Sequence, residues 1–455
     1  MSGFLERRFR LRERGTSVGI EVLAGLTTFA TLSYILFVQP AVLSSPGCGM
    51  DPGGVLFATC VASALACFLM AWWADYPIAL APGMGHNFLF AFTLCGAMGW
   101  SWRQALAANL IAGVAFLGLA RFGLRERVMN ALPQGLAHGI AAGIGLLIAF
   151  IGLQWGGLVR AQPATLVQLG ELSSPVALHT LGGLAIAVVL LARGVRGALL
   201  FAIVASALGG WLASRVFALA TPLVEFNGVV GPPPDPRGTA FQLDFAGLFA
   251  RPWTEWLPIV AIFLCLVLFD TIGTLVGVAG KAGLMVDGKL PRAERALAAD
   301  AAGTTLGALL GTSTVTSYVE SAAGVTAGGR TGLTAIVVGV LFLCALVFAP
   351  LIHSIGAGVD VDGALRYPVI APVLIVVGFL MVAELRHVRW DDPVESFPAF
   401  LCTVVMQLSL SITEGVAFGF LASSILSLAT GRARETSPIV HAFALLFAAR
   451  YVWLV

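Results

Sequence analysis

Residues 311–321 break an apolar segment with the sequence Gly311-Thr312-Ser313-Thr314-Val315-Thr316-Ser317-Tyr318-Val319-Glu320-Ser321. An earlier apolar segment is broken in the same way by Ala81-Pro82-Gly83-Met84-Gly85-His86-Asn87. Glycine, threonine and valine favour extended backbone over helix. At membrane depth, unwound backbone is tolerated only where it is buried in protein or lines a cavity. The two stretches therefore predict paired helix breaks around a buried site.

The composition places both breaks in a membrane protein. Hydrophobic residues make up 58% of the 455 residues, charged residues only 11%, and the mean hydropathy is +0.93. A soluble protein carries about 25% charged residues, so this chain lacks the charge to cover a surface in water. The composition excludes a soluble enzyme, a nucleic-acid-binding protein and a disordered scaffold. The seven cysteines lack CxxC or Cys/His spacing, so no metal site, cofactor or disulfide framework is expected.

Fourteen apolar segments predict the architecture. A helix needs about 20 apolar residues to cross the hydrocarbon core. Segments of that kind, or shorter ones bounded by Gly and Pro, fall at 21–43, 54–74, 76–95, 102–120, 131–154, 178–193, 196–220, 257–280, 296–310, 312–326, 331–350, 366–385, 397–411 and 413–430. We expect an all-α polytopic membrane protein with fourteen spans. Its units are a first seven-span repeat (17–220), a second one (257–431), an extracytoplasmic loop (221–256), and terminal segments (1–16 and 432–455).

Charge and symmetry predict the orientation. With the N-terminus inside, 20 of the 26 Lys and Arg residues fall in cytoplasmic segments, which is the bias seen in membrane proteins. Because seven is odd, the two halves insert in opposite orientations, as in secondary transporters that bind substrate between inverted repeats. The breaks match: Asn87 and Glu320 are 233 residues apart, and the half starts Glu21 and Leu257 are 236 apart. Both termini are expected in the cytoplasm.

Two acids are candidates for the site. Asp270 lies in the middle of an apolar segment and Glu320 follows the second break. A carboxylate at a helix centre costs about 2.5–3.5 kcal/mol on insertion scales, and such acids usually mark transport pathways. The structural alternatives are that Asp270 pairs with Ser/Thr hydroxyls or backbone, and that Glu320 caps a helix. Glu320 could cap a helix and still accept a hydrogen bond from a ligand.

Three further residues beside the breaks are candidates. Asn87 can donate and accept hydrogen bonds together, as recognition of an amide-like ring requires. Tyr318 either stacks on a planar ligand or is an ordinary packing aromatic. His86 either faces the cavity and binds ligand or proton, or packs elsewhere.

Other polar residues have structural interpretations. Asp300, Glu414 and Glu21 fall near predicted span ends, where structural pairing is expected. The tail from Ile439 to Val455 is apolar but of marginal length for a span. We expect it to form a helix that lies on the inner surface or packs on the bundle.

Several segments resemble the xanthine/uracil permease family, in its adenine–guanine–hypoxanthine permease branch. They extend over residues 19–431, and together they are specific although each alone is not. They are Ala24-Gly25-Leu26-Thr27-Thr28-Phe29, Ala81 to Gly85, Ala142 to Gly145, Ala149 to Gln154, Phe269-Asp270-Thr271-Ile272-Gly273-Thr274, Gly311 to Gly324, Gly328 to Thr334, and Glu414 to Phe420.

The resemblance implies a core domain and a gate domain that move relative to one another like an elevator. It implies short antiparallel strands at the centres of the third and tenth spans, with a nucleobase bound between these spans. By that likeness Asp270 and Glu320 grip the ring N–H groups, Asn87 is a polar site residue, and Tyr318 is the aromatic beside the ligand.

The sequence departs from this likeness at two positions. His86 stands where members of the branch often have an apolar residue, which raises the question of a different substrate. Thr274 stands where some relatives elsewhere in the family carry a histidine linked to proton coupling. The proton is then expected on Asp270, Glu320 or His86.

The main hypothesis is a proton-coupled importer of purine nucleobases in the cytoplasmic membrane. An alternative is a transporter of the same fold for another heterocycle or a small anion, but no Lys or Arg lies near either break. A membrane enzyme or sensor is a further alternative, although GxxxxGK[ST] and HExxH motifs are lacking. Expected partners are the nucleobase, a proton and the lipid bilayer, without nucleic acid. Whether the protein forms a homodimer stays open.

Overall fold

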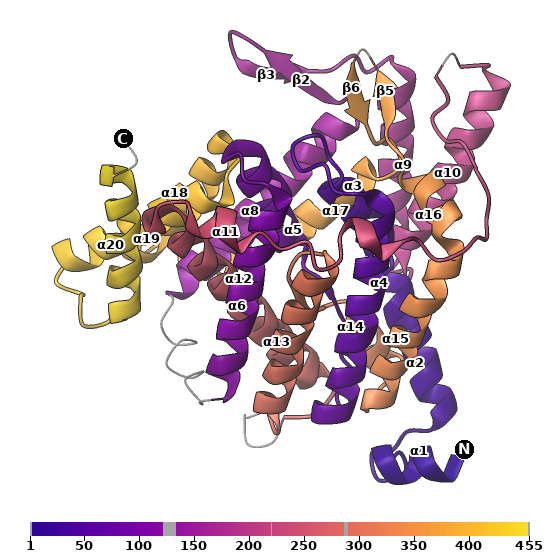
Figure 1. Ribbon diagram of the computed structural model, residues 1–455, viewed down its shortest axis with the longest axis horizontal. Helices are drawn as coiled ribbons and strands as arrows, with labels where there is room; N and C mark the ends of the chain where they lie inside the picture. Colours follow the sequence, from indigo (N-terminus) through magenta and orange to yellow (C-terminus); the bar gives the residue numbers. More distant parts are fainter. Residues whose placement is uncertain (1, 122–132, 220, 286–289, 362, 454–455) are drawn as a thin grey trace.

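The computed structural model describes residues 2–121, 133–219, 221–285, 290–361 and 363–453, which are predominantly helical (Figure 1). The first half contains α1 (Ser2–Phe9), α2 (Val18–Leu32), α3 (Ile35–Leu43), α4 (Pro52–Leu69), β1 (Leu80–Pro82), α5 (Met84–Phe88), α6 (Trp102–Arg121), α8 (Gln134–Trp155), β2 (Val159–Gln162), β3 (Leu166–Leu169), α9 (Pro175–Ala192) and α10 (Ala198–Val216). A π-helical turn, Leu89–Ala97, continues α5.

The second half follows with α11 (Phe245–Phe249), α12 (Trp253–Lys281), α13 (Ala293–Leu310), β4 (Val315–Ser317), α14 (Ser321–Thr326), α15 (Gly332–Ala345), α16 (Ala349–Gly356), β5 (Val359–Val361), β6 (Ala364–Arg366), α17 (Ala371–Val382), α18 (Pro393–Ser409), α19 (Ile412–Ala429) and α20 (Pro438–Trp453). Each of the fourteen predicted segments thus holds a helix, or a strand and a helix. The predicted boundaries at 131 and 220 lie outside the described residues. So do Arg125, Arg127 and Lys289, which are among the 20 basic residues assigned to cytoplasmic segments.

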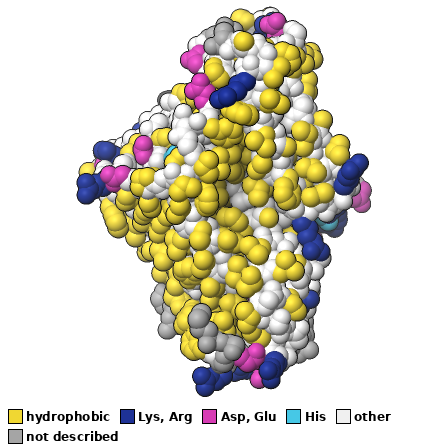
Figure 2. Space-filling model, turned by 90° about the vertical axis from the view of Figure 1, so that its right-hand side faces the viewer, with side chains coloured by type: hydrophobic (Ala, Val, Ile, Leu, Met, Phe, Trp, Pro, Cys, Tyr) yellow, Lys and Arg dark blue, Asp and Glu magenta, His cyan; other side chains and the backbone are white. Residues whose placement is uncertain are grey.

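The structure confirms a polytopic membrane fold. Within the described ranges, nine helices are long and apolar enough to cross a membrane. Figure 2 shows apolar side chains over the middle of one face and charged side chains toward its two ends. Leu208 and Leu212 of α10 and Val188 and Val189 of α9 are among the exposed apolar side chains. The count of fourteen spans and the inverted repeat stay predictions.

Acidic and hydroxyl side chains cap helix starts. Asp51 precedes Pro52, and its Oδ2 accepts a hydrogen bond from the Gly54 N–H at 2.6 Å at the start of α4. Glu21 is fully buried, and its carboxylate accepts hydrogen bonds from the N–H groups of Arg330 and Thr331 at 2.9 and 3.4 Å. These contacts hold the turn before α15 against α2, so the structural interpretation of Glu21 is confirmed.

The helices pack as two bundles. The core bundle consists of α2, α3, α4, α6, α13 and α15, and the gate bundle consists of α8, α9, α10, α17, α18 and α19. Helix α12 packs against α6 and α14 on one side and against α20 on the other. The tail helix α20 packs on α19 and α12, and Arg450 Nη2 pairs with Glu414 Oε1 at 2.7 Å. The predicted structural pairing of Glu414 is therefore confirmed.

Two ends of the molecule can be named from Figure 1. The hairpins β2–β3 and β5–β6 lie together at one end, which we call the hairpin end, and α1 lies at the opposite one, the α1 end. Arg14 ties the segment after α1 to the bundle, because its Nη2 pairs with Asp75 Oδ2 at 2.8 Å. Phe9 and Leu11 are buried against Leu333.

Candidate functional site

The two predicted breaks meet in a short antiparallel sheet. Strand β1 pairs with β4 in the register Leu80–Ser317, Ala81–Thr316 and Pro82–Val315, and all six residues are buried. The Gly83 N–H extends the pairing to the Thr314 carbonyl at 2.9 Å. Pairing satisfies backbone groups that would otherwise be buried without partners. The prediction of short strands in the third and tenth segments is confirmed.

Neighbouring helices hold the hydroxyl-rich stretch before and within β4. Gln39 Nε2 of α3 donates to Thr312 Oγ1 at 2.9 Å and to Ser313 Oγ at 3.0 Å. The Thr314 hydroxyl donates to Asn109 Oδ1 of α6 at 2.6 Å. In the same region, Thr316 Oγ1 lies 3.1 Å from Thr271 Oγ1 of α12, and Thr304 of α13 donates to the Val315 carbonyl at 2.7 Å. Side chains of α3, α6, α12 and α13 therefore hold the second break in place.

Glu320 lies directly after β4 and is half-buried. Its Oε1 accepts a hydrogen bond from the Tyr34 hydroxyl at 2.8 Å. Its side chain makes no capping hydrogen bond to α14, so the helix-cap alternative is wrong. The carboxylate is instead held by Tyr34, which lies between α2 and α3 and which no sequence pattern singles out.

Asp270 faces open space. It lies in the middle of α12, yet its side chain is exposed and accepts no hydrogen bond from the described residues. It is close enough to Glu320 for the two charges to interact. On the same face of α12, Cβ atoms added at Gly273, Gly277 and Gly280 would meet no heavy atom within 4 Å. A carboxylate that faces lipid is costly, so Asp270 and the open face of α12 that carries it are candidates for contact with water or a ligand.

The remaining predicted residues surround the strands. Asn87 is fully buried, and its Oδ1 accepts a hydrogen bond from the Ser313 hydroxyl. The Tyr318 hydroxyl donates to the Pro82 carbonyl at 2.5 Å, which ties β4 to β1. His86 is buried, and neither ring nitrogen has a partner in the described structure. Thr274 is buried one turn after Asp270. Their contact with a ligand stays a prediction.

Asp300 is a residue of this region that the sequence analysis placed wrongly. Helix α13 begins at Ala293, so Asp300 lies inside the helix rather than near its end. It is fully buried, and its Oδ2 accepts hydrogen bonds from the Ser317 N–H and hydroxyl, both at 2.8 Å. Its Oδ1 has no partner within the described ranges. An acid in an otherwise apolar, small-residue helix was the signal that could have found it.

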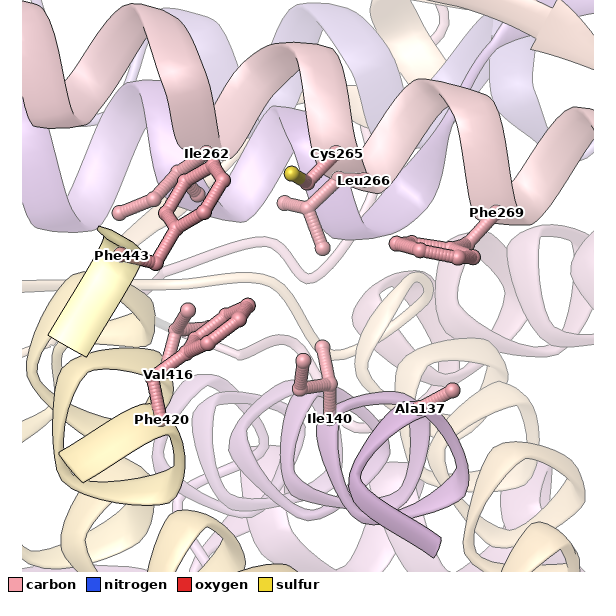
Figure 3. Close-up of a pocket in the computed structure, with 9 residues that line it drawn as sticks. All are labelled: Ala137, Ile140, Ile262, Cys265, Leu266, Phe269, Val416, Phe420 and Phe443. Carbon is pink, nitrogen blue, oxygen red and sulfur yellow. The ribbon is translucent and has the colours of Figure 1, made fainter. Parts of the chain in front are cut away.

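The cavity in Figure 3 is not the candidate site. It measures about 30 Å³ and lies between α12, α8, α19 and α20. Apolar side chains and Cys265 line it, without an acid or an amide. A space of this size holds about one water molecule, so it is a packing gap between the two bundles.

Comparison with known proteins identifies the class of protein. The Permease family model of xanthine/uracil permeases matches residues 19–443. The Escherichia coli adenine permease AdeP is 40% identical over 99% of this chain and 97% of its own length. The Bacillus subtilis guanine/hypoxanthine permease PbuO is 41% identical over 96% of this chain and 98% of its own length.

Solved structures share the fold. The transmembrane domain of the cyanobacterial bicarbonate transporter BicA superposes with a TM-score of 0.62 at 14% identity, over 87% of this chain and 97% of that domain. The transporter SLC26A9 gives 0.61 at 13% identity, over 90% of this chain and 65% of its own. The protein is therefore an integral membrane transporter and not an enzyme. It belongs to the xanthine/uracil permease family.

Proposed function

We propose that this permease imports a purine nucleobase together with a proton across the cytoplasmic membrane. The observation that carries the proposal is Asp270, an exposed carboxylate in the middle of α12 that has no partner among the described residues and lies close to Glu320. AdeP and PbuO, at 40% and 41% identity, support a purine as the substrate class. We place both termini in the cytoplasm, as the basic residues predict.

The recognition chemistry follows from the side chains. Ionised carboxylates only accept hydrogen bonds, and purine rings carry N–H donors. Asp270 and Glu320 accept these donors, and hydrogen bonds to charged groups are about twice as strong as neutral ones. Tyr318 bonds to Pro82 of β1 and Asn87 bonds to Ser313 just before β4, and we include both among the substrate-binding residues. His86 and Thr274 complete the binding residues.

Proton coupling follows from two neighbouring acids. Two negative charges in one enclosed site repel each other, so a proton that enters with the nucleobase relieves the repulsion. The membrane potential adds about 2.3 kcal/mol per charge per 100 mV to inward movement. The proton resides on Asp270 or Glu320, and its release toward the cytoplasm restores the empty site.

Movement of the core bundle past the gate bundle gives alternating access. The cytoplasmic loop between α9 and α10 contacts the C-terminal end of α2, since a Cβ on Gly197 would lie 3.2 Å from Ala30 Cβ. Ala30 is twelve residues beyond the start of α2, about 18 Å along the helix. The core bundle thus extends further toward the α1 end than the gate bundle. Together with the open face of α12, this offset supports an inward-open position.

A small anion is the rival substrate. Solved structures of this fold include a bicarbonate transporter, but at 14% identity they speak for the fold alone. The side chains that hold residues 312–317 are neutral or acidic in the described structure. An anion needs a positive or neutral donor site, and two carboxylates disfavour it. A nucleobase with ring N–H groups fits better.

Uptake into proteoliposomes tests the proposal. Labelled hypoxanthine, guanine and adenine are offered with an imposed inward proton gradient, to wild type, Glu320→Gln and Asp270→Asn. We expect uptake by the wild type that an uncoupler abolishes, and loss of uptake in both variants. Glu435→Gln, at an exposed acid far from the site, is the control and retains uptake. Full, uncoupler-insensitive uptake by Glu320→Gln would falsify the mechanism.

A further inference from the structure

A second and much larger cavity lies toward the hairpin end. Its volume is about 460 Å³, and it is bounded by α3, the start of α4, α16 and Tyr367 just after β6. Small-molecule sites typically measure about 300–1,000 Å³. The cavity is therefore large enough for a bicyclic heterocycle.

Aromatic side chains and glycines shape this cavity. Phe37 of α3 and Tyr367 both line it. A Cβ on Gly358 would lie 3.0 Å from Tyr367 Cε1, and a Cβ on Gly356 would lie 3.5 Å from the Phe37 carbonyl. Tyr367 is fixed from behind by Trp155, with ring centroids 4.2 Å apart. Rigid aromatic walls suit a flat ring that binds by stacking.

Polar groups without partners also line the cavity. The Ser44 hydroxyl is buried and unpartnered in the described structure. The Asn227 backbone N–H donates to Ser354 Oγ at 3.0 Å, but no described residue bonds to the Asn227 side-chain amide, the His353 ring or the Tyr367 hydroxyl, which lie around the same space. A few polar groups in a mostly apolar wall are typical of sites that orient a small ligand. Aliphatic lipid chains would leave these groups unpaired.

Helix α3 connects this cavity with the central site. Leu36, Phe37 and Pro40 line the cavity. Gln39, on the other side of the same helix, holds Thr312 and Ser313 at the break. The two spaces are thus separated by the thickness of one helix.

We propose that this cavity is an outer subsite that holds the nucleobase before it reaches Asp270 and Glu320. The ligand class is a planar heterocycle with ring N–H and carbonyl or amino groups. Phe37 and Tyr367 stack on the ring, and Ser44, Asn227 and His353 bond to its edge. This inference rests on the proposed function, and the subsite faces the side from which the nucleobase is imported.

Labelling at position 44 tests the subsite. Ser44→Cys in the full chain is reacted with a membrane-impermeant maleimide in right-side-out vesicles, with and without hypoxanthine. The protein without this substitution measures the background from the native cysteines, of which Cys344 is exposed. We expect hypoxanthine to slow labelling several-fold, both in the otherwise wild-type protein and in combination with Asp270→Asn and Glu320→Gln. Protection that disappears in the combined variant overturns the subsite, because the central site alone then explains it.

A second measurement covers the case that Ser44→Cys does not fold. Tyr367→Leu is expected to raise the KM of hypoxanthine uptake several-fold while hypoxanthine affinity of the detergent-purified central site is unchanged. An unchanged KM contradicts the subsite. Absence of any purine uptake by the wild type contradicts the proposed function instead, so the two failures are distinguishable.

Discussion

Asp300 holds strand β4 through a single carboxylate oxygen. Replacing it with alanine leaves the Ser317 N–H and hydroxyl buried without an acceptor, and an unsatisfied buried group costs about 1–3 kcal/mol. We expect Asp300→Ala to lower the unfolding temperature of the purified protein and to weaken hypoxanthine binding. Asp300→Asn keeps an acceptor oxygen at a similar position, so we expect it to lower the unfolding temperature less than Asp300→Ala does. Thermal unfolding followed by tryptophan fluorescence measures both.

The matched control for this residue is Asp391→Ala. Asp391 is exposed and makes no hydrogen bond or ion pair with the described residues, and surface substitutions of this kind change stability by about 0.5 kcal/mol or less. If Asp300→Ala unfolds at the same temperature as Asp391→Ala, Asp300 does not hold the strand.

At the scale of elements, the open face of α12 makes a testable surface. A side chain added at Gly277 meets no neighbour, so it should fit without destabilising the helix bundle. We expect Gly277→Phe to fold normally but to reduce nucleobase uptake, because the added ring covers the open face of α12 that carries Asp270. Gly139→Phe is the contrasting variant, since even a Cβ there would lie 2.6 Å from Ala399 Cα, and it is expected to unfold. Uptake and detergent gel filtration separate blocked transport from misfolding.

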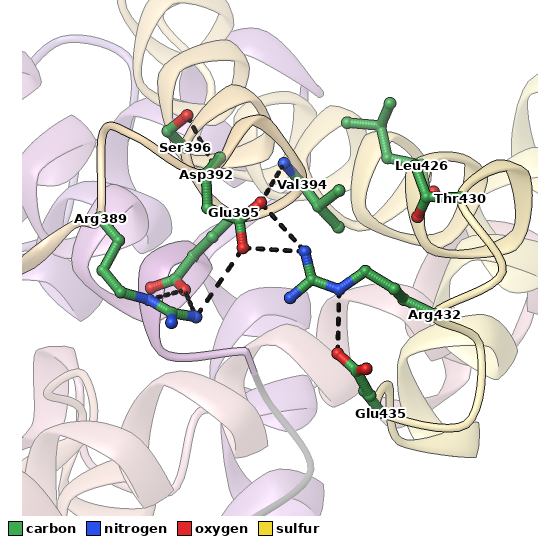
Figure 4. A network of polar contacts seen from close by, with 9 residues as sticks. All are labelled: Arg389, Asp392, Val394, Glu395, Ser396, Leu426, Thr430, Arg432 and Glu435. Atoms are coloured by element: carbon green, nitrogen blue, oxygen red, sulfur yellow. Dashed lines mark hydrogen bonds and ion pairs between the residues drawn. The ribbon is translucent and has the colours of Figure 1, made fainter.

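An ion-pair network links the start of α18 to the end of α19 (Figure 4). Arg432 Nη1 donates to Asp392 Oδ2 at 2.8 Å, and this guanidinium lowers the pKa of the Asp392 carboxyl below its usual range. A lowered folded-state pKa stabilises the protein above the unfolded pKa, and the contribution disappears as pH falls through the folded value. We expect Arg432→Gln to lower thermal stability slightly at pH 7, and the difference to fade as the pH falls below the ordinary aspartate pKa of about 3.9. High salt should shrink the difference, since exposed pairs are screened.

Prediction from sequence succeeded for the elements and partly for the site. The helices and the β1–β4 strands were predictable, because apolar length and Gly, Thr and Val content are local properties. Asp270 and Glu320 stood out because acids are rare in apolar segments. Tyr34 and Gln39 could not be predicted, because their roles depend on which helices pack beside β4. Asp300 was placed wrongly by a helix boundary that differs by three residues.

At the scale of the whole molecule, the two bundles provide a surface along which one can slide. Apolar side chains, as in the gap of Figure 3, line the boundary where α12 meets α8 and α19. Polar contacts that would resist sliding are concentrated within the core bundle, around β4. Under the proposed mechanism, we expect β4 and the side chains that hold it to move with the core bundle as one body.

A cross-link between the bundles tests this movement. Disulfides form where Cβ atoms lie about 3.5–4.5 Å apart, and the Gly197 and Ala30 positions, at 3.2 Å, approach that range. Gly197 is buried at the start of α10 and has a φ of +75°, so cysteine there costs some backbone strain. We expect the double variant Ala30→Cys, Gly197→Cys to lose nucleobase uptake when oxidised and to recover it on reduction. Each single variant should be insensitive to oxidant. A cross-linked protein that transports at the wild-type rate would show that the bundles need not move at this contact.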